Sequence, residues 1–108
     1  MKVFFFNTRT QEEIPDSQAL EASVEQALEI FEKLPQDGGS FLGIINEDAI
    51  HIQFRKYNRF MWLIEIPVVT KNGNFVYVCH KDKCKRIIDQ LFEGIDPLLL
   101  AEFTFENE

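Results

Sequence analysis

Three runs of alternating apolar residues between positions 49 and 80 constrain the fold of this chain most strongly. The apolar positions are Ile50, Ile52 and Phe54; then Phe60, Trp62, Ile64 and Ile66; then Phe75, Tyr77 and Cys79. A period of two is typical of strands that bury one face of a sheet. Short polar turns join the runs, and the Asn72–Gly73 pair is typical of a hairpin because both residues tolerate positive φ. The region therefore predicts an antiparallel meander, which a strand at residues 41–45 extends to four strands.

The flanking segments predict two helices. Ser23 and Gln26 have the spacing of a capping box at the start of the first helix, which Pro35 ends. The second helix is expected over residues 81–93, and Gly94 suits the left-handed position after its last turn. The apolar residues of each helix recur at spacings of three and four, so each helix has one face for the core. These residues are Val24, Ala27, Leu28, Phe31 and Leu34 in the first helix, and Cys84, Ile87, Ile88 and Leu91 in the second.

The ends of the chain predict two further strands, at residues 3–6 and 101–105, and residues 7–16 are expected to form a loop. Pro67 cannot donate to a strand ladder, so its strand should end, bulge or lie at an edge there. Together the elements predict an α+β fold in a single domain, residues 1–108. It consists of an antiparallel sheet, made of the four-strand meander plus terminal strands, with two helices packed on it.

Composition and charge limit the possible partners and the expected cellular location of this protein. The net charge of −7 disfavours non-specific binding to nucleic acid or to an anionic membrane surface, although it is compatible with a basic partner. The two cysteines are fewer than a secreted scaffold of this size usually has, so free thiols in a reducing compartment are expected. No apolar run approaches the length of a membrane span, and residues 1–6 are too short for a signal peptide. The expected location is the cytoplasm.

The polar positions of the meander form the candidate binding face. His51, Gln53, Arg55 and Glu65 fall opposite the apolar phase. This side is either an ordinary solvated face or a binding face with a titratable histidine at its centre. Met61 and Leu63 share its phase, so a helix or a partner is expected to cover part of it. The candidate partner-binding residues are His51, Gln53, Arg55, Tyr57, Arg59 and Glu65.

Two of these candidates, Tyr57 and Arg59, lie in a turn. They are expected to be anchors for a partner if that turn is exposed, because Tyr and Arg are frequent at interface hot spots. Trp62 is of an equally suitable type, but it lies in the core phase of its strand, and a buried ring is the preferred interpretation.

Support for catalysis or metal binding is thin. Cys79, His80 and Cys84 offer three of the four ligands that a structural zinc site needs, and both cysteines fall in the core phase of their elements. The basic cluster at residues 80–86 lacks a glycine-rich phosphate loop, so a solvated face is preferred over an anion site. His51 and His80 are the main acid–base candidates at neutral pH. We expect no catalytic residue, cofactor or metal, and a protein that is not an enzyme.

Acidic residues occur in three groups along the chain. Each group is interpreted as a solvated face, or the groups together as a negative surface for a basic protein. They are Glu12, Glu13 and Asp16; Glu25, Glu29 and Glu32; and Glu102, Glu106 and Glu108.

The order of the predicted elements resembles small bacterial immunity proteins that neutralise polymorphic toxins, in particular the group paired with deaminase-type toxins. The matching patches are Gly73-Asn74-Phe75 with Tyr77, then Phe92-Glu93-Gly94, then Phe103 and Phe105, in order within residues 23–105. The last strand of that group often has Trp where this chain has Phe. The resemblance implies tight binding to a cognate toxin whose active site is blocked, and it implies no particular contact residue.

The sequence therefore leaves three candidate functions. The first is a non-enzymatic immunity protein that binds a cognate basic toxin through an acidic face and exposed sheet residues. The alternative is a small-molecule-binding or regulatory domain of a bacterial cytoplasmic protein, with a phenylalanine-lined pocket between sheet and helices. The third is a small enzyme that pairs His51 or His80 with a carboxylate in a cleft. An unpaired edge strand would also permit a homodimer.

Overall fold

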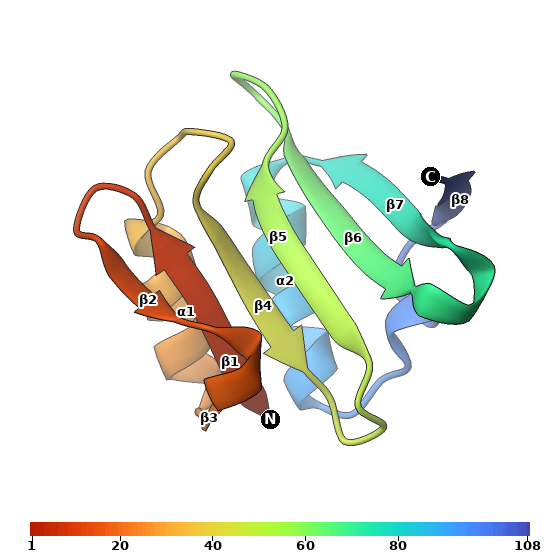
Figure 1. The fold of residues 1–108 in the computed structure, drawn as a ribbon, viewed down its shortest axis with the longest axis horizontal. Helices are drawn as coiled ribbons and strands as arrows, with labels where there is room; N and C mark the ends of the chain where they lie inside the picture. The colour runs from red at the N-terminus through yellow and green to blue at the C-terminus, as the bar shows by residue number, and fades with distance from the viewer.

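A computed structural model describes residues 1–108 as one antiparallel sheet with two α-helices behind it (Figure 1). The sheet order is β2-β1-β4-β5-β6-β7-β8, and the short β3 also pairs with β1. The strands are β1 (Lys2–Asn7), β2 (Glu12–Ile14), β3 (Leu20–Glu21), β4 (Phe41–Ile45), β5 (His51–Lys56), β6 (Trp62–Val68), β7 (Gly73–Cys79) and β8 (Thr104–Asn107). The helices are α1 (Val24–Lys33) and α2 (Lys81–Phe92), with short 3-10 turns at Asp16–Gln18, Val69–Lys71 and Pro97–Leu99. The predicted α+β fold, with its antiparallel sheet and two helices, is confirmed.

Both helices lie against the same face of the sheet, and the core fills the space between (Figure 1). The apolar phase of the meander points into this space, so Ile52, Phe54, Trp62 and Ile64 are buried as predicted. α1 contributes Ala27 and Phe31 to the core, and all four predicted inward residues of α2 are buried. Phe31 packs against Trp62 with ring centroids 4.6 Å apart. Aromatic packing thus joins α1 to the middle of the sheet.

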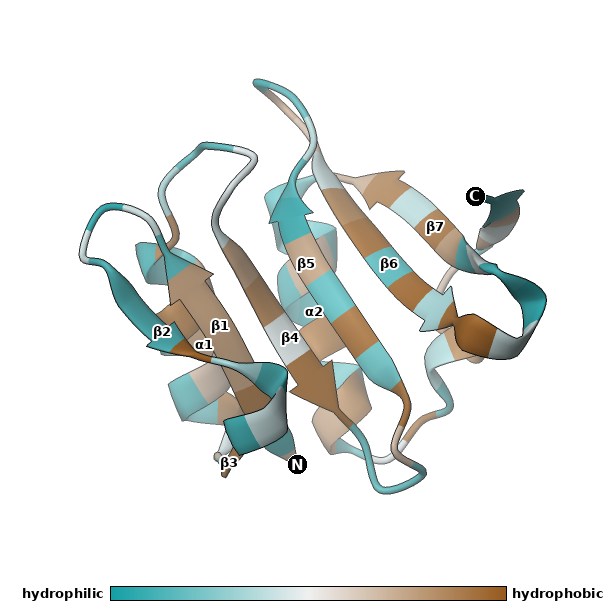
Figure 2. Cartoon of the chain, viewed as in Figure 1, coloured by the Kyte–Doolittle hydropathy of each residue, from teal (hydrophilic) through white to brown (hydrophobic).

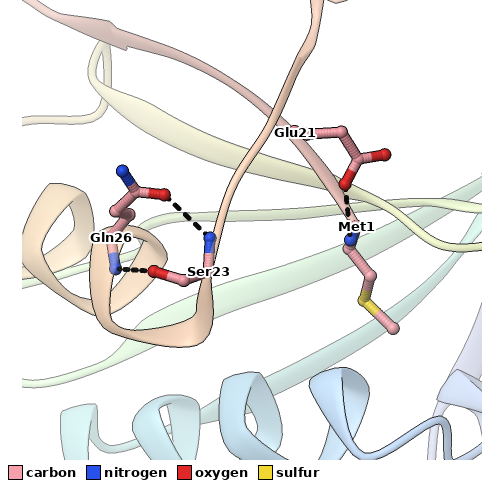
Figure 3. A network of polar contacts seen from close by, with 4 residues as sticks. All are labelled: Met1, Glu21, Ser23 and Gln26. Atoms are coloured by element: carbon pink, nitrogen blue, oxygen red, sulfur yellow. Dashed lines mark hydrogen bonds and ion pairs between the residues drawn. The ribbon is translucent and has the colours of Figure 1, made fainter.

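The beginning of α1 has the predicted capping box (Figure 3). The Gln26 backbone N–H donates to the Ser23 hydroxyl at 3.2 Å, and the Ser23 backbone N–H donates to the Gln26 side-chain oxygen at 2.8 Å. Nearby, the amino group of Met1 lies 3.2 Å from a carboxylate oxygen of Glu21, which links β1 to β3. These contacts position α1 beneath the end of the sheet that contains β1.

The structure corrects the predictions near the two ends of the chain. Residues 7–16 do not form a simple loop, because β2 turns back to pair with β1 and a 3-10 turn begins at Asp16. The last strand spans 104–107 rather than 101–105, where it pairs with residues 73–76 of β7. The position of such a short strand depends more on pairing with a neighbouring strand than on its own apolar pattern, which explains both errors.

The meander also differs in detail from its prediction. β6 begins at Trp62 rather than at Arg59, and a 3-10 turn separates it from β7. Asn72 has positive φ, but Gly73 does not; Gly94 does, as predicted. Gly73 is required for another reason, since a Cβ there would lie 2.4 Å from the carbonyl oxygen of Glu106 in β8. Pro67 lies beyond the part of β6 that pairs with β5, so the strand is locally an edge there, as one of the predicted options allowed.

The outer strands of the sheet are short and carry glutamates. β2 has the sequence Glu-Glu-Ile and β8 the sequence Thr-Phe-Glu-Asn. Short, charged edges are the devices by which natural sheets discourage pairing with another chain. Neither α1 nor α2 is long and apolar enough to cross a membrane.

Candidate functional site: the open sheet face

One face of the sheet has no α-helix over it, because both α-helices lie behind the other face, and only the 3-10 turn at Asp16–Gln18 lies in front of β1 (Figure 1). The pairing register places alternate residues of the five longest strands on it. We call this surface the open sheet face; its members are Lys2, Phe4, Phe6, Phe41, Gly43, Ile45, His51, Gln53, Arg55, Leu63, Glu65, Pro67, Asn74, Val76 and Val78. Seven of these fifteen residues have large apolar side chains, which is unusual for a face exposed to water.

The apolar residues lie mainly on the two sides of the open sheet face, around a polar middle. Figure 2 shows β1 as almost continuously hydrophobic, whereas β5 alternates between hydrophobic and hydrophilic residues. Antiparallel strands with one solvated face should alternate as β5 does. Continuous apolar runs in β1, β4 and β7 are instead typical of strands that are covered on both faces.

Phe4 is the centre of the apolar group on the β1 side. Its ring lies over Gly43 of β4, where a Cβ would be only 2.0 Å from the ring's Cζ. Phe41 meets the ring edge-on, with centroids 6.1 Å apart, and His51 lies 5.6 Å away. Although no helix covers this side, Phe4 is only 3% exposed. The glycine therefore creates a slot in which a neighbouring aromatic ring is held.

The polar middle contains four of the residues singled out from the sequence. Arg55 forms an ion pair with Glu65 across β5 and β6, with Nη2 to Oε1 at 3.0 Å. Gln53 pairs in register with Glu65, and His51 lies further along β5. The positive and negative charges of this group balance, so the open sheet face is not itself an acidic surface.

The turn between β5 and β6 exposes aromatic side chains, and in Figure 1 it extends beyond the edge of the sheet. Tyr57 is 57% exposed and Phe60 is 69% exposed. The Arg59 guanidinium lies 5.5 Å from the Phe60 ring centroid. The Asn58 side chain orders the turn by accepting from the backbone N–H groups of Phe60 and Met61 at 3.0 and 2.9 Å. Tyr57 and Arg59 thus lie at an exposed tip, separate from the four candidates on the sheet.

Trp62 lies immediately beyond this turn and is buried, in agreement with the preferred interpretation. Its ring packs against Phe31 on the helix side, and the Lys56 ammonium lies 5.0 Å from the ring centroid. Trp62 therefore cannot contact a partner directly.

The acidic residues of α1 are largely paired with lysines. Glu29 contacts Lys33 at 2.9 Å, and Glu32 contacts both Lys81 and Lys85 of α2 at 2.7 Å. Hydrogen bonds first from Lys81 and then from Lys85 hold the pKa of Glu32 below its ordinary value. Because lysines neutralise two of its three glutamates, α1 offers a weaker negative surface than its sequence alone indicates.

The two histidines do not form the histidine–carboxylate pairs that a small enzyme, the third candidate function, would need. His51 contacts the Phe4 ring, and His80 is the residue before α2, where its side chain makes no capping hydrogen bond. Neither side chain has a hydrogen bond or ion pair with a carboxylate. No group of three or more His, Cys, Asp or Glu residues is arranged to hold a metal ion.

A cavity of about 320 Å³ lies between α1 and the strands β1, β2 and β3. Val3, Phe5, Ile14 and Ile30 contribute apolar surface, and Glu12, Glu29 and Lys33 contribute charge. It lies between sheet and helix, as the small-molecule hypothesis expects, but only one phenylalanine lines it. Its volume is at the lower end of the range for ligand pockets.

Several residues of the open sheet face were not among the sequence candidates: Phe4, Phe6, Phe41, Val76 and Val78. The runs Phe4-Phe5-Phe6 and Phe75-Val76-Tyr77-Val78 carried the signal, because apolar residues occupy both phases of each strand. Exposed Phe60 was also missed, since its phase matched the core side of the meander.

Comparison with known proteins found no matching protein-family model, no matching curated protein and no matching solved structure.

Proposed function

We propose that this protein is a non-enzymatic binding domain whose open sheet face is covered by a protein partner, and that the partner is a toxin neutralised by occlusion of its active site. The observation that carries the proposal is the apolar face without a helix over it. Phe6, Phe41, Leu63 and Val78 occupy one row across β1, β4, β6 and β7, with Arg55 between them on β5. Covering this row would remove apolar surface from water, which is the main driving force for protein association.

The dimensions and chemistry of this surface suit such a partner. The molecule extends 34 × 30 × 24 Å and Figure 1 looks down the shortest axis, so the open sheet face lies along the two longer dimensions of the molecule. One partner contributes about 800 Å² to an interface of standard size. The tip formed by Tyr57, Arg59 and Phe60 adds the residue types that anchor interfaces.

The immunity assignment draws on the resemblance and on overall charge. The expected order of a helix, an antiparallel meander, a second helix and a short last strand is the order in the fold. The net charge of −7 favours encounter with a basic toxin, since long-range attraction accelerates association. Contact itself would be made by the open sheet face rather than by α1, whose acids are mostly paired. The gene is expected to lie beside one for a large secreted toxin.

The test is a pull-down of tagged protein from its native cells, followed by mass spectrometry and by reconstitution with the partner identified. Leu63→Asp, which puts a charge into the apolar row, should abolish copurification of a stoichiometric basic protein. Leu99→Asp is the matched control, because Leu99 is 78% exposed in the turn after α2, outside the open sheet face. Both variants must retain the wild-type circular dichroism spectrum. Equal binding by the two variants would overturn the assignment of this face.

A second experiment separates the tip from the sheet. Tyr57→Ala should weaken the reconstituted complex by roughly 10- to 100-fold, the range expected for an aromatic anchor. An identified partner without toxic activity would preserve the binding-domain proposal and remove the immunity assignment.

The cavity beside α1 supports a second candidate function, a small-molecule-binding or regulatory domain. The discriminating experiment is a thermal-shift screen with small apolar ligands. A ligand that stabilises the wild type but not Ala22→Phe, which would fill the cavity, would favour this function over the toxin partner. Equal stabilisation of both proteins would place the ligand elsewhere.

A further inference from the structure

Cys79 and Cys84 are in direct contact where β7 leads into α2. Cys79 is the last residue of β7 and Cys84 lies in the first turns of α2, and their sulfur atoms are 3.5 Å apart. Both are free thiols. Two cysteines isolated in a core could not bond to each other. Here a small movement of either side chain would bring the two sulfur atoms to bonding distance.

The two thiols differ in their access to the surface. Cys84 is completely buried, whereas Cys79 is 5% exposed. Cys79 also lines a surface hollow beside Lys83, Arg86, His80 and Asp82. A reagent that enters the hollow would therefore meet Cys79 first.

The pKa values of the two thiols also favour reaction at Cys79 before Cys84. The contact with Cys84 holds the pKa of Cys79 below its usual value and outweighs the opposing effect of burial, and the charge of Lys83 acts in the same direction. The same contact, followed by burial, raises the pKa of Cys84. Cys79 is thus the thiol that ionises first, and the thiolate is the reactive form.

We propose that Cys79 and Cys84 form a dithiol modification site, which small anionic disulfides oxidise to an intramolecular disulfide. The Cys79 thiol loses its proton, and its sulfur attacks one sulfur of the reagent RSSR. The reagent's S–S bond breaks, and RS⁻ leaves and takes up a proton. The Cys84 thiol then gives up its proton and attacks the Cys79 sulfur, which releases the second RS⁻. In total, two protein thiols lose two electrons and two protons, and RSSR is reduced to two RSH.

The preference for an anionic reagent follows from the charges around the hollow. Lys83 and Arg86 are cationic and Asp82 is the acid among the lining residues. An excess of positive charge beside Cys79 would raise the local concentration of an anionic disulfide and repel a cationic one. The two reacting thiols are not part of the open sheet face, but Val78 of that face also lines the hollow, so the reaction is tested on the protein without a partner.

The test compares oxidised glutathione, which is anionic, with cystamine, which is cationic, on the folded protein. Oxidised glutathione should consume both thiols and leave a product about 2 Da lighter than the reduced protein, with Cys79 and Cys84 in one linked peptide. It should react several-fold faster than cystamine. Lys83→Gln should reduce this preference, and Lys71→Gln, at the opposite end of β7, should leave it unchanged.

Two cysteine variants test the order of attack. Cys84→Ser should stop at a mixed disulfide between glutathione and Cys79, and Cys79→Ser should react at least tenfold more slowly than Cys84→Ser. If either variant fails to fold, the product formed from the wild-type protein still tests whether Cys79 and Cys84 become linked. Glutathione attached separately to each cysteine, faster reaction with cystamine, or retention of both thiols would overturn the proposal.

Discussion

Replacing Gly43 with alanine should destabilise the protein by displacing the Phe4 ring from the open sheet face. The new Cβ would lie 2.0 Å from Cζ and 2.3 Å from both Cε atoms of the ring, so the ring must move. Burial of a whole Phe side chain contributes about 1.5–3 kcal/mol. Alanine is favoured over glycine within a strand by about 0.5–1 kcal/mol, which offsets part of this loss. The expected net loss is about 1–2 kcal/mol, measured by urea denaturation monitored by circular dichroism.

A matched glycine and a double-mutant cycle make the interpretation specific. Gly38→Ala is the control, because a Cβ there meets nothing within 4 Å. In a Phe4→Ala background the obstructing ring is gone, so Gly43→Ala should be neutral or stabilising. The same cost for Gly43→Ala with and without the Phe4 ring would refute the reasoning, since the loss would then come from the backbone rather than from the slot.

Three further predictions concern the elements that support the site. Ser23→Ala should lower the free energy of unfolding by about 1 kcal/mol in urea titrations, because the Gln26 backbone N–H loses its cap; an unchanged midpoint would contradict this. Glu32→Gln should destabilise the protein at neutral pH by removing contacts with two lysines of α2. Since folding lowers the pKa of Glu32, that difference should shrink as pH falls below 4.5 in parallel denaturation curves, and a constant difference would oppose it. Gly73→Ala should detach β8 from β7 and accelerate hydrogen exchange at residues 104–107, whereas continued protection would show that the backbone adapts.

Local patterns were sufficient to predict the helices and the meander. Ser23 and Gln26 identify the beginning of α1 because a cap is a contact between near neighbours in the chain. Cys84, Ile87, Ile88 and Leu91 identify the inner face of α2 because helical periodicity places them together. The same reasoning placed His51, Gln53, Arg55 and Glu65 on one side of the sheet, where the structure brings them together around an ion pair.

The sequence by itself determined the two helices, the strands of the meander, and which phase of the central strands faces the core. Only the tertiary structure decided that β1 pairs with β4, that residues 12–14 return to β1, and that both helices cover one face. These are pairings between distant segments, and runs such as residues 3–6 and 75–78 are apolar in both phases, so periodicity cannot select the outward side. The slot that Gly43 provides for Phe4 exists only once β1 lies beside β4, because a glycine's use depends on the side chain that crosses it from the neighbouring strand.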